Sequence, residues 1–413
     1  MKLSQSFTKT FRTVSREETA QNAQLLIRAG FIHKEFAGVY TYLPLGLKTL
    51  ENIKNIVREE LNRIGCQEIL MTTLQMPDIW QKSDRWNPDK MDIWFKTELA
   101  AGGELGLAPT HEEPITNMLR EYISSYKDLP AYIYQFQTKF RNELRAKSGI
   151  MRTREFLMKD LYSFSVDQES HDQFYHQVEK VYAKIYDRLG LGDCTYQTFA
   201  SGGVFSKYSH EFQTVLPVGE DIIYYNEDKS VVLNEEVLND EVLKDLGVKR
   251  EDLQSTHAAE VGNIFTLGTK YSAPLGLEFT NREGKRQPVI MGSYGIGISR
   301  VMGVIAEKFA DKDGLVWPET VAPFRYHIIG IGEQGEAKAA ALHDLYPDLI
   351  LLDDRNLRPG EKFADADLMG IPTRIVISDK TLAHQEIEVT TRQDHTKKVL
   401  QLDEFLATLK SVA

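Results

Sequence analysis

The sequence predicts an α/β protein made of a larger α+β part with a mainly antiparallel sheet and a small α/β domain after it. At 413 residues, with 42% hydrophobic and 26% charged residues, the chain is globular in composition and too long for one ordinary domain. Long alternating segments in residues 130–164 predict the antiparallel strands, and regular strand–helix alternation from residue 322 predicts the second domain. We therefore expect domains over residues 1–321 and 322–413.

The elements of the first domain follow from hydrophobic periodicity. Residues 46–64 carry leucine, isoleucine and valine at spacings of three and four, which predicts an amphipathic helix that Gly65 ends, and a strand is expected over 66–72. In residues 130–164 polar and apolar side chains alternate on both sides of a basic loop, which predicts two long antiparallel strands. A helix over 171–190 and a pair of strands within 210–225 come next.

Residues 226–257 differ in character, with nine acidic against four basic side chains, and predict a solvated, helical connection. Strands are expected over 261–268 and 287–292, and the glycine-rich stretch 292–309 predicts a strand that runs into a helix. From residue 324 to the end, short apolar strands alternate with helices, which predicts a small domain with a largely parallel core.

Composition excludes several classes of protein. The two cysteines, Cys66 and Cys194, cannot form a disulfide framework and fit a reducing compartment, so we expect a cytoplasmic protein. No Cys/His cluster predicts a metal site, and no apolar run approaches the roughly 18 residues of a membrane span. The net charge of −11 argues against diffuse coating of nucleic acid, although it leaves room for local basic patches.

One such patch is residues 139–156, KFRNELRAKSGIMRTREF, with six lysines and arginines against two glutamates. Arg141 could bind a phosphate or carboxylate, and Glu143 could accept a hydrogen bond from an amine. An ion pair between these two is the alternative. Arg152 and Phe156 return from the other strand, and an arginine beside an aromatic ring suits a nucleotide, whereas Phe156 as a core residue is the alternative.

A second candidate lies in the stretch GSYGIGISR. Gly292, Gly295 and Gly297 fit neither a Walker loop nor a dinucleotide fingerprint. Small residues there allow either close approach of a ligand to the backbone or tight packing of strand on helix. Arg300, at the start of the expected helix, could bind an anion.

A third candidate is PTHEEPI, residues 109–115, between a strand and a helix. Thr110 could cap the helix together with Glu113 in a capping box. Alternatively, Thr110 and Glu112 project into a ligand site. His210, in SHEF, would by itself be assigned to the core.

Together these motifs resemble the bacterial-type prolyl-tRNA synthetases, which are class II aminoacyl-tRNA synthetases, over nearly the whole chain. GVYTYLPLGLKTLENIKNIVREELNRIG with the strand after it resembles the first class motif, FRNE with RTREF the second, and GSYGIGISR the third. Prolyl-type segments occur in the expected order: LIRAGFI, PTHEE, MKDLYSF, SHEF, LGTKYS, LLDDR and KFADADLMGIP. The resemblance implies a class II catalytic domain, an anticodon-binding domain and a homodimer formed through residues 38–72.

The resemblance also implies roles for single residues. ATP, with Mg²⁺, would be bound by Arg141 at the α-phosphate, by Arg152 and Arg300 at the γ-phosphate, and by Glu143 and Phe156 at adenine. Arg141, which also grips the amino-acid carboxylate, and Arg300 would be the catalytic residues. Proline would be bound by Arg141 together with Thr110, Glu112, His210 and Ser293, the last at a position where many relatives have cysteine.

Contacts with tRNA are expected in two places. Arg145 and Lys147, in the basic loop, would meet the acceptor stem, with solvated loop charge as the alternative. Arg355, Arg358 and Lys362 are the candidates for anticodon binding.

The implied activity is ligation of L-proline to tRNA(Pro) through prolyl-adenylate. The alternatives are a class II synthetase for another small amino acid, a tRNA-binding paralogue without activity, and a ligase that makes a free adenylate. Many bacterial relatives carry an editing domain between the second and third motifs, and residues 226–257 are too few for one. We therefore expect that alanine is misactivated and that a separate protein corrects the error, because a missing methylene changes binding by only about 1–3 kcal/mol.

Overall fold

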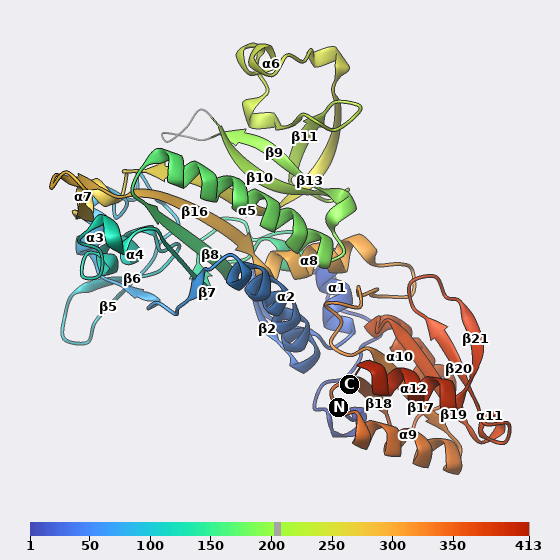
Figure 1. Cartoon of the computed structure of the whole chain (residues 1–413). Coiled ribbons are helices and arrows are strands. Elements are labelled where there is room, and N and C mark those ends of the chain that lie inside the picture. Colours follow the sequence, from blue (N-terminus) through green and yellow to red (C-terminus); the bar gives the residue numbers. More distant parts are fainter. Residues whose placement is uncertain (202–207, 413) are drawn as a thin grey trace. The chain divides into compact units, whose positions relative to one another are not determined.

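The structure, a computed structural model, describes residues 1–201 and 208–412, and the chain divides into two compact units (Figure 1). One unit comprises Met1–Phe36, Tyr40–Ile53 and Ile305–Ala413, and the other comprises Ala37–Val39 and Lys54–Val304. The helices α2 (Pro44–Arg63) and α8 (Ile298–Phe309) each run from one unit into the other. The predicted boundary at residue 321 lies inside the first unit, and the division into domains at that point stays a prediction.

The larger unit is built on a nine-stranded sheet of order β10-β9-β12-β11-β13-β16-β8-β7-β3. Toward one end of this order, next to the edge strand, β7 (Ala131–Phe140) and β8 (Glu155–Ser165) pair antiparallel, as predicted, with Tyr134 opposite Leu161. Next to β8 lie β16 (Ile290–Gly297) and β13 (Gln254–Gly268), both antiparallel, and α5 (Gln168–Arg188) packs across these strands (Figure 1). The mainly antiparallel sheet and the helices predicted near 46–64 and 171–190 are confirmed.

Two strand predictions need correction. The strand expected over 66–72 is limited to β3 (Gln67–Glu68), which pairs in parallel with β7 at the edge of the sheet. The two strands expected within 210–225 exist as β10 (Tyr208–Val215) and β11 (Asp221–Tyr225), but each pairs with β13. The long β13 can serve both because the two strands contact different parts of its length.

The acidic segment 226–257 is not the helical connection that its charge predicted. It forms β12 (Val232–Asn234), the short helix α6 (Asp240–Leu246), two 3-10 turns (Glu235–Val237 and Arg250–Asp252) and the start of β13. Its few aliphatic side chains gather into a small buried cluster: Leu233, Val237, Val242 and Leu243. These side chains anchor the segment to the sheet beside β9 (Thr195–Ser201), while the acidic groups face outward.

A second layer of short elements lies on the far side of β7 and β8. The strands β4 (Leu74–Gln75), β6 (Glu104–Leu107) and β5 (Phe95–Glu98) form a small sheet, and a cluster of three tryptophans packs beside α3 (Pro77–Lys82). The helix α4 (Glu112–Leu119) follows β6 directly and brings the PTHEE motif to the main sheet. The remaining elements are η2 (Tyr126–Asp128), η3 (Gly149–Met151), η4 (Gly192–Cys194), α7 (Ser272–Leu275), β14 (Glu278–Thr280) and β15 (Arg286–Pro288).

The other unit contains a five-stranded sheet of order β18-β17-β19-β20-β21. Its three strands β17 (Tyr326–Ile331), β18 (Ile350–Asp353) and β19 (Thr373–Ser378) are parallel, which confirms the predicted largely parallel core, and β20 (Glu386–Thr391) and β21 (Lys397–Gln401) are antiparallel. Four helices belong to this sheet: α9 (Glu333–Leu345), α10 (Pro359–Met369), α11 (Asp379–Leu382) and α12 (Leu402–Val412). The N-terminal elements of the unit are η1 (Leu3–Gln5), α1 (Gln21–Arg28), β1 (Ile32–Phe36) and β2 (Val39–Tyr42).

In the part of the chain that the structure describes, no helix combines the length and the hydropathy needed to cross a bilayer.

The centre of the main sheet gives a stability prediction. Leu161 on β8 is fully buried, so Leu161→Ala should lower the free energy of unfolding of this unit by about 2–5 kcal/mol through lost burial and a cavity. Urea unfolding followed by tryptophan fluorescence measures this, because Trp80, Trp86 and Trp94 all lie in this unit. The control Leu144→Ala, at a side chain that is 93% exposed, should change it by less than about 0.5 kcal/mol. Equal effects of the two changes would contradict the assigned core.

Candidate active site

Two adjoining cavities lie at the ends of the central strands and share Arg141, Met158, Asn263 and Gly295. The first cavity is lined by charged and polar side chains together with one aromatic ring: Arg141, Glu143, Arg152, Phe156, Glu260, Asn263 and Arg300. The second, of about 250 Å³, is mostly apolar and holds Thr110, Glu112 and Ser293. The structure therefore brings together ten of the residues singled out in the sequence, counting Gly295 and Gly297.

Arg141 lies at the junction of the cavities, just beyond the last residue of β7. Its backbone N–H donates to the carbonyl of Arg154 at 2.8 Å, which continues the hairpin past the strand end. Its Nε donates to the carbonyl of Pro109 at 3.3 Å, and its guanidinium lies 5.2 Å from the centroid of the Phe156 ring. Burial, and next the charge of Arg300, lower the pKa of Arg141, so an anion at this point would be strongly favoured.

Glu143 pairs with Arg152, at 2.9 Å, and the alternative of an Arg141–Glu143 ion pair is therefore wrong. The reason is local: β7 ends at Phe140, so Arg141 and Glu143 do not continue the strand alternation that the sequence predicted. Arg152 is also 2.9 Å from Glu220, and these hydrogen bonds raise its pKa. The Arg152 guanidinium is thus held at the mouth of the first cavity.

Arg300 reaches the same cavity from the first turn of α8. Its Nε donates to the carbonyl of Met151 and its Nη1 to the carbonyl of Glu260, both at 2.8 Å, and the Glu260 carboxylate is 3.4 Å away. Backbone carbonyls orient this guanidinium without neutralising it. Its charge is consequently available to an anion in the cavity.

The glycine cluster serves both predicted purposes, helix packing and close approach of a ligand, at different positions. A Cβ at Gly292 would lie 2.7 Å from His171 of α5, so this glycine allows the helix to pack on the sheet. Gly295 and Gly297 line the first cavity, and a Cβ at Gly295 would lie 2.4 Å from the Met158 side chain. A side chain at Gly295 would fill space at the junction of the two cavities.

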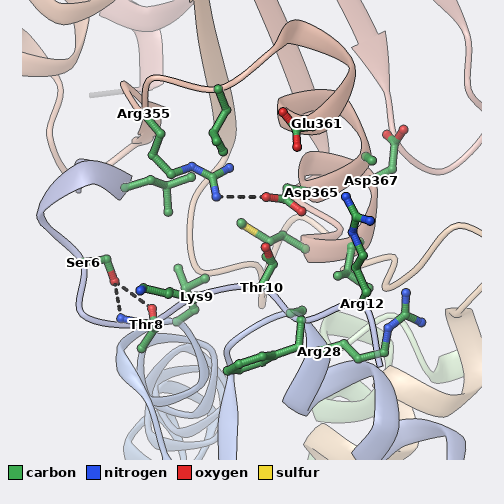
Figure 2. A pocket seen from close by; sticks show the side chains of 18 of the residues that line it. Ser6, Thr8, Lys9, Thr10, Arg12, Arg28, Arg355, Glu361, Asp365 and Asp367 are labelled. Carbon is green, nitrogen blue, oxygen red and sulfur yellow. Dashed lines mark hydrogen bonds and ion pairs between the residues drawn. The ribbon is translucent and has the colours of Figure 1, made fainter. Parts of the chain in front are cut away.

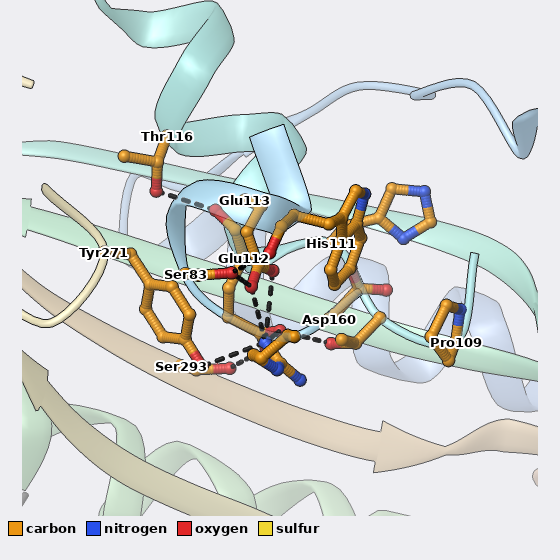
Figure 3. A network of polar contacts seen from close by, with 12 residues as sticks. Ser83, Pro109, His111, Glu112, Glu113, Thr116, Asp160, Tyr271 and Ser293 are labelled. Atoms are coloured by element: carbon orange, nitrogen blue, oxygen red, sulfur yellow. Dashed lines mark hydrogen bonds and ion pairs between the residues drawn. The ribbon is translucent and has the colours of Figure 1, made fainter. Parts of the chain in front are cut away.

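In the second cavity Glu112 is the central group (Figure 3). Thr110 Oγ1 donates to Glu112 Oε2 at 2.6 Å and Ser293 Oγ donates to Oε1 at 3.3 Å. Burial alone would raise the pKa of Glu112, but Arg85 and Thr110 outweigh it, and the pKa is lowered. Glu112 is therefore an ionised carboxylate within apolar walls that include Met91, Ile93, Phe265 and Leu267.

The capping-box alternative for this loop is wrong. The residue before the first turn of α4 is His111, whose side chain makes no capping hydrogen bond. Thr110 donates to a side chain that lines the cavity, and Glu113 accepts from Ser83 at 2.6 Å and from Arg85 at 3.1 Å. Both glutamates at the start of α4 also sit favourably near the positive end of the helix dipole.

A buried polar network holds the loop that carries Thr110 and His111. Lys139 Nζ lies 2.8 Å from Asp160 Oδ1 and also contacts His111 Nδ1. Burial, and next the charge of Lys139, lower the pKa of His111 to about 4, so the imidazole is neutral. Asp160 lines the second cavity, and its other oxygen accepts from Gln135 and Tyr162.

Sequence reasoning missed Asp160, Asn263 and Arg85. Asp160 could have been found, because it shares the alternating face of β8 with Phe156 and Met158, which both line the cavities. Asn263 belongs to β13, in which no polar pattern singles it out. Arg85 lies in a loop 27 residues before Glu112, and no local pattern connects the two.

His210 is not where the prediction put it. Its Nδ1 lies 2.9 Å from the Tyr175 hydroxyl and 3.2 Å from the Glu179 carboxylate, both on α5, and its ring packs near Phe199. Among the described residues that line the second cavity, His210 is not found. The geometry therefore does not support a role for His210 in the proline pocket, because its side chain points toward α5.

The residues expected to contact tRNA differ in their exposure and in their ion pairs. Arg145 and Lys147 are exposed in the loop between β7 and β8, and Lys147 lies 3.8 Å from Glu220. In the other unit, Arg355 lines a cavity of about 990 Å³ between the N-terminal segment and α10, where Asp353 and Asp365 bind it (Figure 2). Arg358, before the first turn of α10, is exposed.

Lys362 is a wrong prediction as an RNA contact. Its side chain is 3% exposed, and its Nζ donates to the carbonyl of Asp353 at 3.2 Å. Lys362, Ala366 and Met369 occupy successive turns on the buried face of α10. The lysine thus ties the helix to the end of β18 instead of facing solvent.

Comparisons with known proteins identify the fold. Residues 95–309 match the tRNA synthetase class II core domain (G, H, P, S and T), and residues 329–412 match an anticodon binding domain. The fold is thus that of a class II tRNA synthetase.

Curated relatives show to which family of class II synthetases the chain belongs. A proline–tRNA ligase of Bartonella henselae is 36% identical over 437 residues, which covers 98% of this chain and 99% of the relative. One from Ehrlichia chaffeensis is 38% identical over 426 residues, covering 99% and 100%. The chain belongs to the proline–tRNA ligase family.

Solved structures share the fold. The crystal structure of prolyl-tRNA synthetase from Cryptosporidium parvum complexed with L-proline and AMP superposes with a TM-score of 0.75. Its sequence identity is 18%, and the match covers 95% of this chain and 74% of that one.

Proposed function

We propose that the chain activates L-proline with ATP to form prolyl-adenylate and transfers the prolyl group to the 3′ end of tRNA(Pro). The observation that carries the proposal is the pair of cavities that share Arg141. One is suited to a nucleoside triphosphate and the other to a small amino acid with an apolar side chain. The family membership and the names of the full-length relatives support the same activity.

The second cavity fits proline by charge and shape. A secondary ammonium carries one positive charge and two N–H donors, which the buried, ionised Glu112 can accept. Thr110 and Ser293 hold the two carboxylate oxygens, and the apolar walls can surround the pyrrolidine ring. Arg141, at the junction with the first cavity, is placed to bind the proline carboxylate.

The first cavity fits ATP. Phe156 offers its ring face to adenine, Glu143 offers an acceptor to the adenine amino group, and Arg152 and Arg300 flank the space where the terminal phosphate would lie. In this arrangement the proline carboxylate oxygen attacks the α-phosphorus, the bond to the bridging oxygen breaks, and pyrophosphate leaves. Arg141 binds both reacting groups, so its contribution is positioning and stabilisation of the charge in the transition state.

Carboxylates beside the first cavity fit Mg²⁺. Glu260 lines it, and Glu211 and Asp221 lie close enough that burial and their mutual charge raise the pKa of Glu211 to about 7. Mg²⁺ bound with ATP uses one or two carboxylates together with phosphate oxygens. The ion would neutralise phosphate charge, while Glu260 and its neighbours would hold it.

The amino-acid specificity gives the main experiment. In ATP–pyrophosphate exchange with each of the twenty amino acids, proline should give the highest kcat/KM, because only a secondary ammonium with a compact ring matches Glu112 and the apolar walls. No exchange with any amino acid would favour the tRNA-binding paralogue. A lead for threonine, glycine or histidine would favour a synthetase for that amino acid.

Alanine lacks two of the ring methylenes, and each contributes about 10- to 200-fold to discrimination, so it should give weaker but measurable exchange, at least about 100-fold below proline. Correction by a separate protein is part of the proposal, and deacylation of alanyl-tRNA(Pro) by the purified chain would contradict it.

The basic loop between β7 and β8 is proposed to meet the acceptor stem. Neither Arg145 nor Lys147 is among the described residues that line the first cavity, and both are exposed. Arg355 and Arg358, in the anticodon-binding unit, are the remaining candidates for contacts with the anticodon.

Arg145→Ala should slow aminoacylation of tRNA(Pro) about tenfold, the effect of losing one charge-assisted contact, and leave proline-dependent ATP–pyrophosphate exchange unchanged. Arg300→Ala is the contrasting variant, because loss of a guanidinium in the first cavity should reduce both reactions. Parallel assays of exchange and aminoacylation separate the two. If Arg145→Ala reduced exchange as much as aminoacylation, the tRNA role would be wrong.

A homodimer and a cytoplasmic location complete the proposal. Three large apolar side chains are exposed within residues 70–76: Leu70 at 75%, Leu74 at 55% and Met76 at 53%. They follow β3, the edge strand of the nine-stranded sheet, and such a patch at a sheet edge suits contact with a second copy of the chain. The absence of a disulfide, with Cys66 and Cys194 both free, suits the cytoplasm.

Leu70→Asp should therefore convert a dimer into monomers of 47.1 kDa, since it places a charge within the apolar patch. Sedimentation velocity measures the mass. Leu144→Asp, at a leucine that is still more exposed and outside residues 70–76, is the matched control and should remain dimeric. A monomeric unmodified protein, or a dimeric Leu70→Asp variant, would contradict the proposal.

A further inference from the structure

Arg85 lies between the carboxylates of Glu112 and Glu113 and binds Glu113 more closely. Its Nη1 lies 3.1 Å from both carboxylate oxygens of Glu113, 2.9 Å from the Tyr271 hydroxyl and 3.3 Å from Glu112 Oε2. This nitrogen has only two hydrogens, so it cannot serve four acceptors at full strength. The distances indicate that Arg85 is committed mainly to Glu113 and Tyr271, and less to Glu112.

Because Arg85 is bound mainly to Glu113 and Tyr271, the negative charge of Glu112 is only partly neutralised. Two ionised glutamates and one arginine carry one net negative charge, and a buried charge needs a partner. Thr110 and Ser293 donate hydrogen bonds to Glu112 but bring no positive charge. A substrate ammonium would neutralise this remaining negative charge, provided that Arg85 does not move to Glu112 and neutralise it first.

We infer that Glu113 is a positioning residue for the amino-acid substrate: its carboxylate holds Arg85 back from Glu112, so Glu112 keeps its negative charge for the ammonium of proline. The inference rests on the proposed function. Glu113 does not line the second cavity, and it acts only through Arg85. Without the charge of Glu113, Arg85 would turn to Glu112 and compete with the substrate.

The protonation of Glu113 gives this arrangement a pH dependence. Burial raises the pKa of Glu113 to about 7, against the lowering effect of Arg85, and the neighbouring Glu112 raises it further. The other ionisable groups that face this cluster are Tyr271 and Lys270. Below about pH 7 Glu113 is neutral and releases Arg85; above it Glu113 is ionised and holds Arg85. The KM for proline should therefore fall as pH rises through about 7, since Glu112 and the ammonium keep their charges over this range.

The test is the KM for proline in ATP–pyrophosphate exchange at saturating ATP. Glu113→Gln should raise this KM about tenfold, with kcat and the KM for ATP nearly unchanged. The matched control is Glu121→Gln, the same chemical change at an exposed glutamate just beyond α4, which should have no effect. The conservative variant Glu113→Asp, which keeps the negative charge beside Arg85, should keep this KM within about threefold of the unmodified protein.

Each outcome bears on the inference. An unchanged KM for proline in Glu113→Gln, or a Glu113→Asp variant as impaired as Glu113→Gln, would overturn it, since the inferred role depends on the charge at this position. The pH profile of the unmodified protein is an independent test that needs no variant: a flat KM between about pH 6 and pH 8 would also overturn it. Absence of exchange with any amino acid would instead overturn the proposed function.

Discussion

In the β7–β8 pair, Lys139 lies opposite Phe156, and just beyond it the backbone of Arg141 is hydrogen-bonded to Arg154. This antiparallel register places the two halves of the second class motif side by side, although the loop between them is exposed and basic. A slip of one residue would turn Phe156 and Asp160 away from the cavities, because strand side chains alternate. The geometry of the site depends on this pairing more than on any single side chain.

Buried charge is the second constraint, and it is met by pairing buried groups of opposite charge. On the strand, Lys139 is neutralised by Asp160, and the adjacent His111 is held neutral. At the start of α4, Glu112 and Glu113 share a single arginine, Arg85. Charge that is only partly balanced faces the cavities: the negative charge of Glu112 in one, and the guanidinium groups of Arg141 and Arg300 in the other. A zwitterionic amino acid and a polyanionic nucleotide are complementary to that division.

Much of the fold could be predicted because periodicity is local. The helix near residues 46–64, the paired long strands and the small parallel domain each follow from side-chain spacing along one segment. The segment 226–257 was misjudged because its acidic surface concealed the few aliphatic side chains that anchor it, Leu233 and Leu243 among them. Lys362 was misjudged because its charge was given more weight than its position on the buried face of α10.

By itself the sequence determined which chemical groups are present and in what order. Arg141, Glu143, Arg152, Phe156 and Arg300 were found because their motifs are short and lie within a few residues of the end of β7, the start of β8 or the start of α8. Only the tertiary structure decided their partners: Glu143 with Arg152, Arg85 with Glu113, and His210 with α5. The physical reason is that an ion pair or hydrogen bond depends on a few ångströms in space, and residues that meet there are brought from distant segments by strand pairing and helix packing.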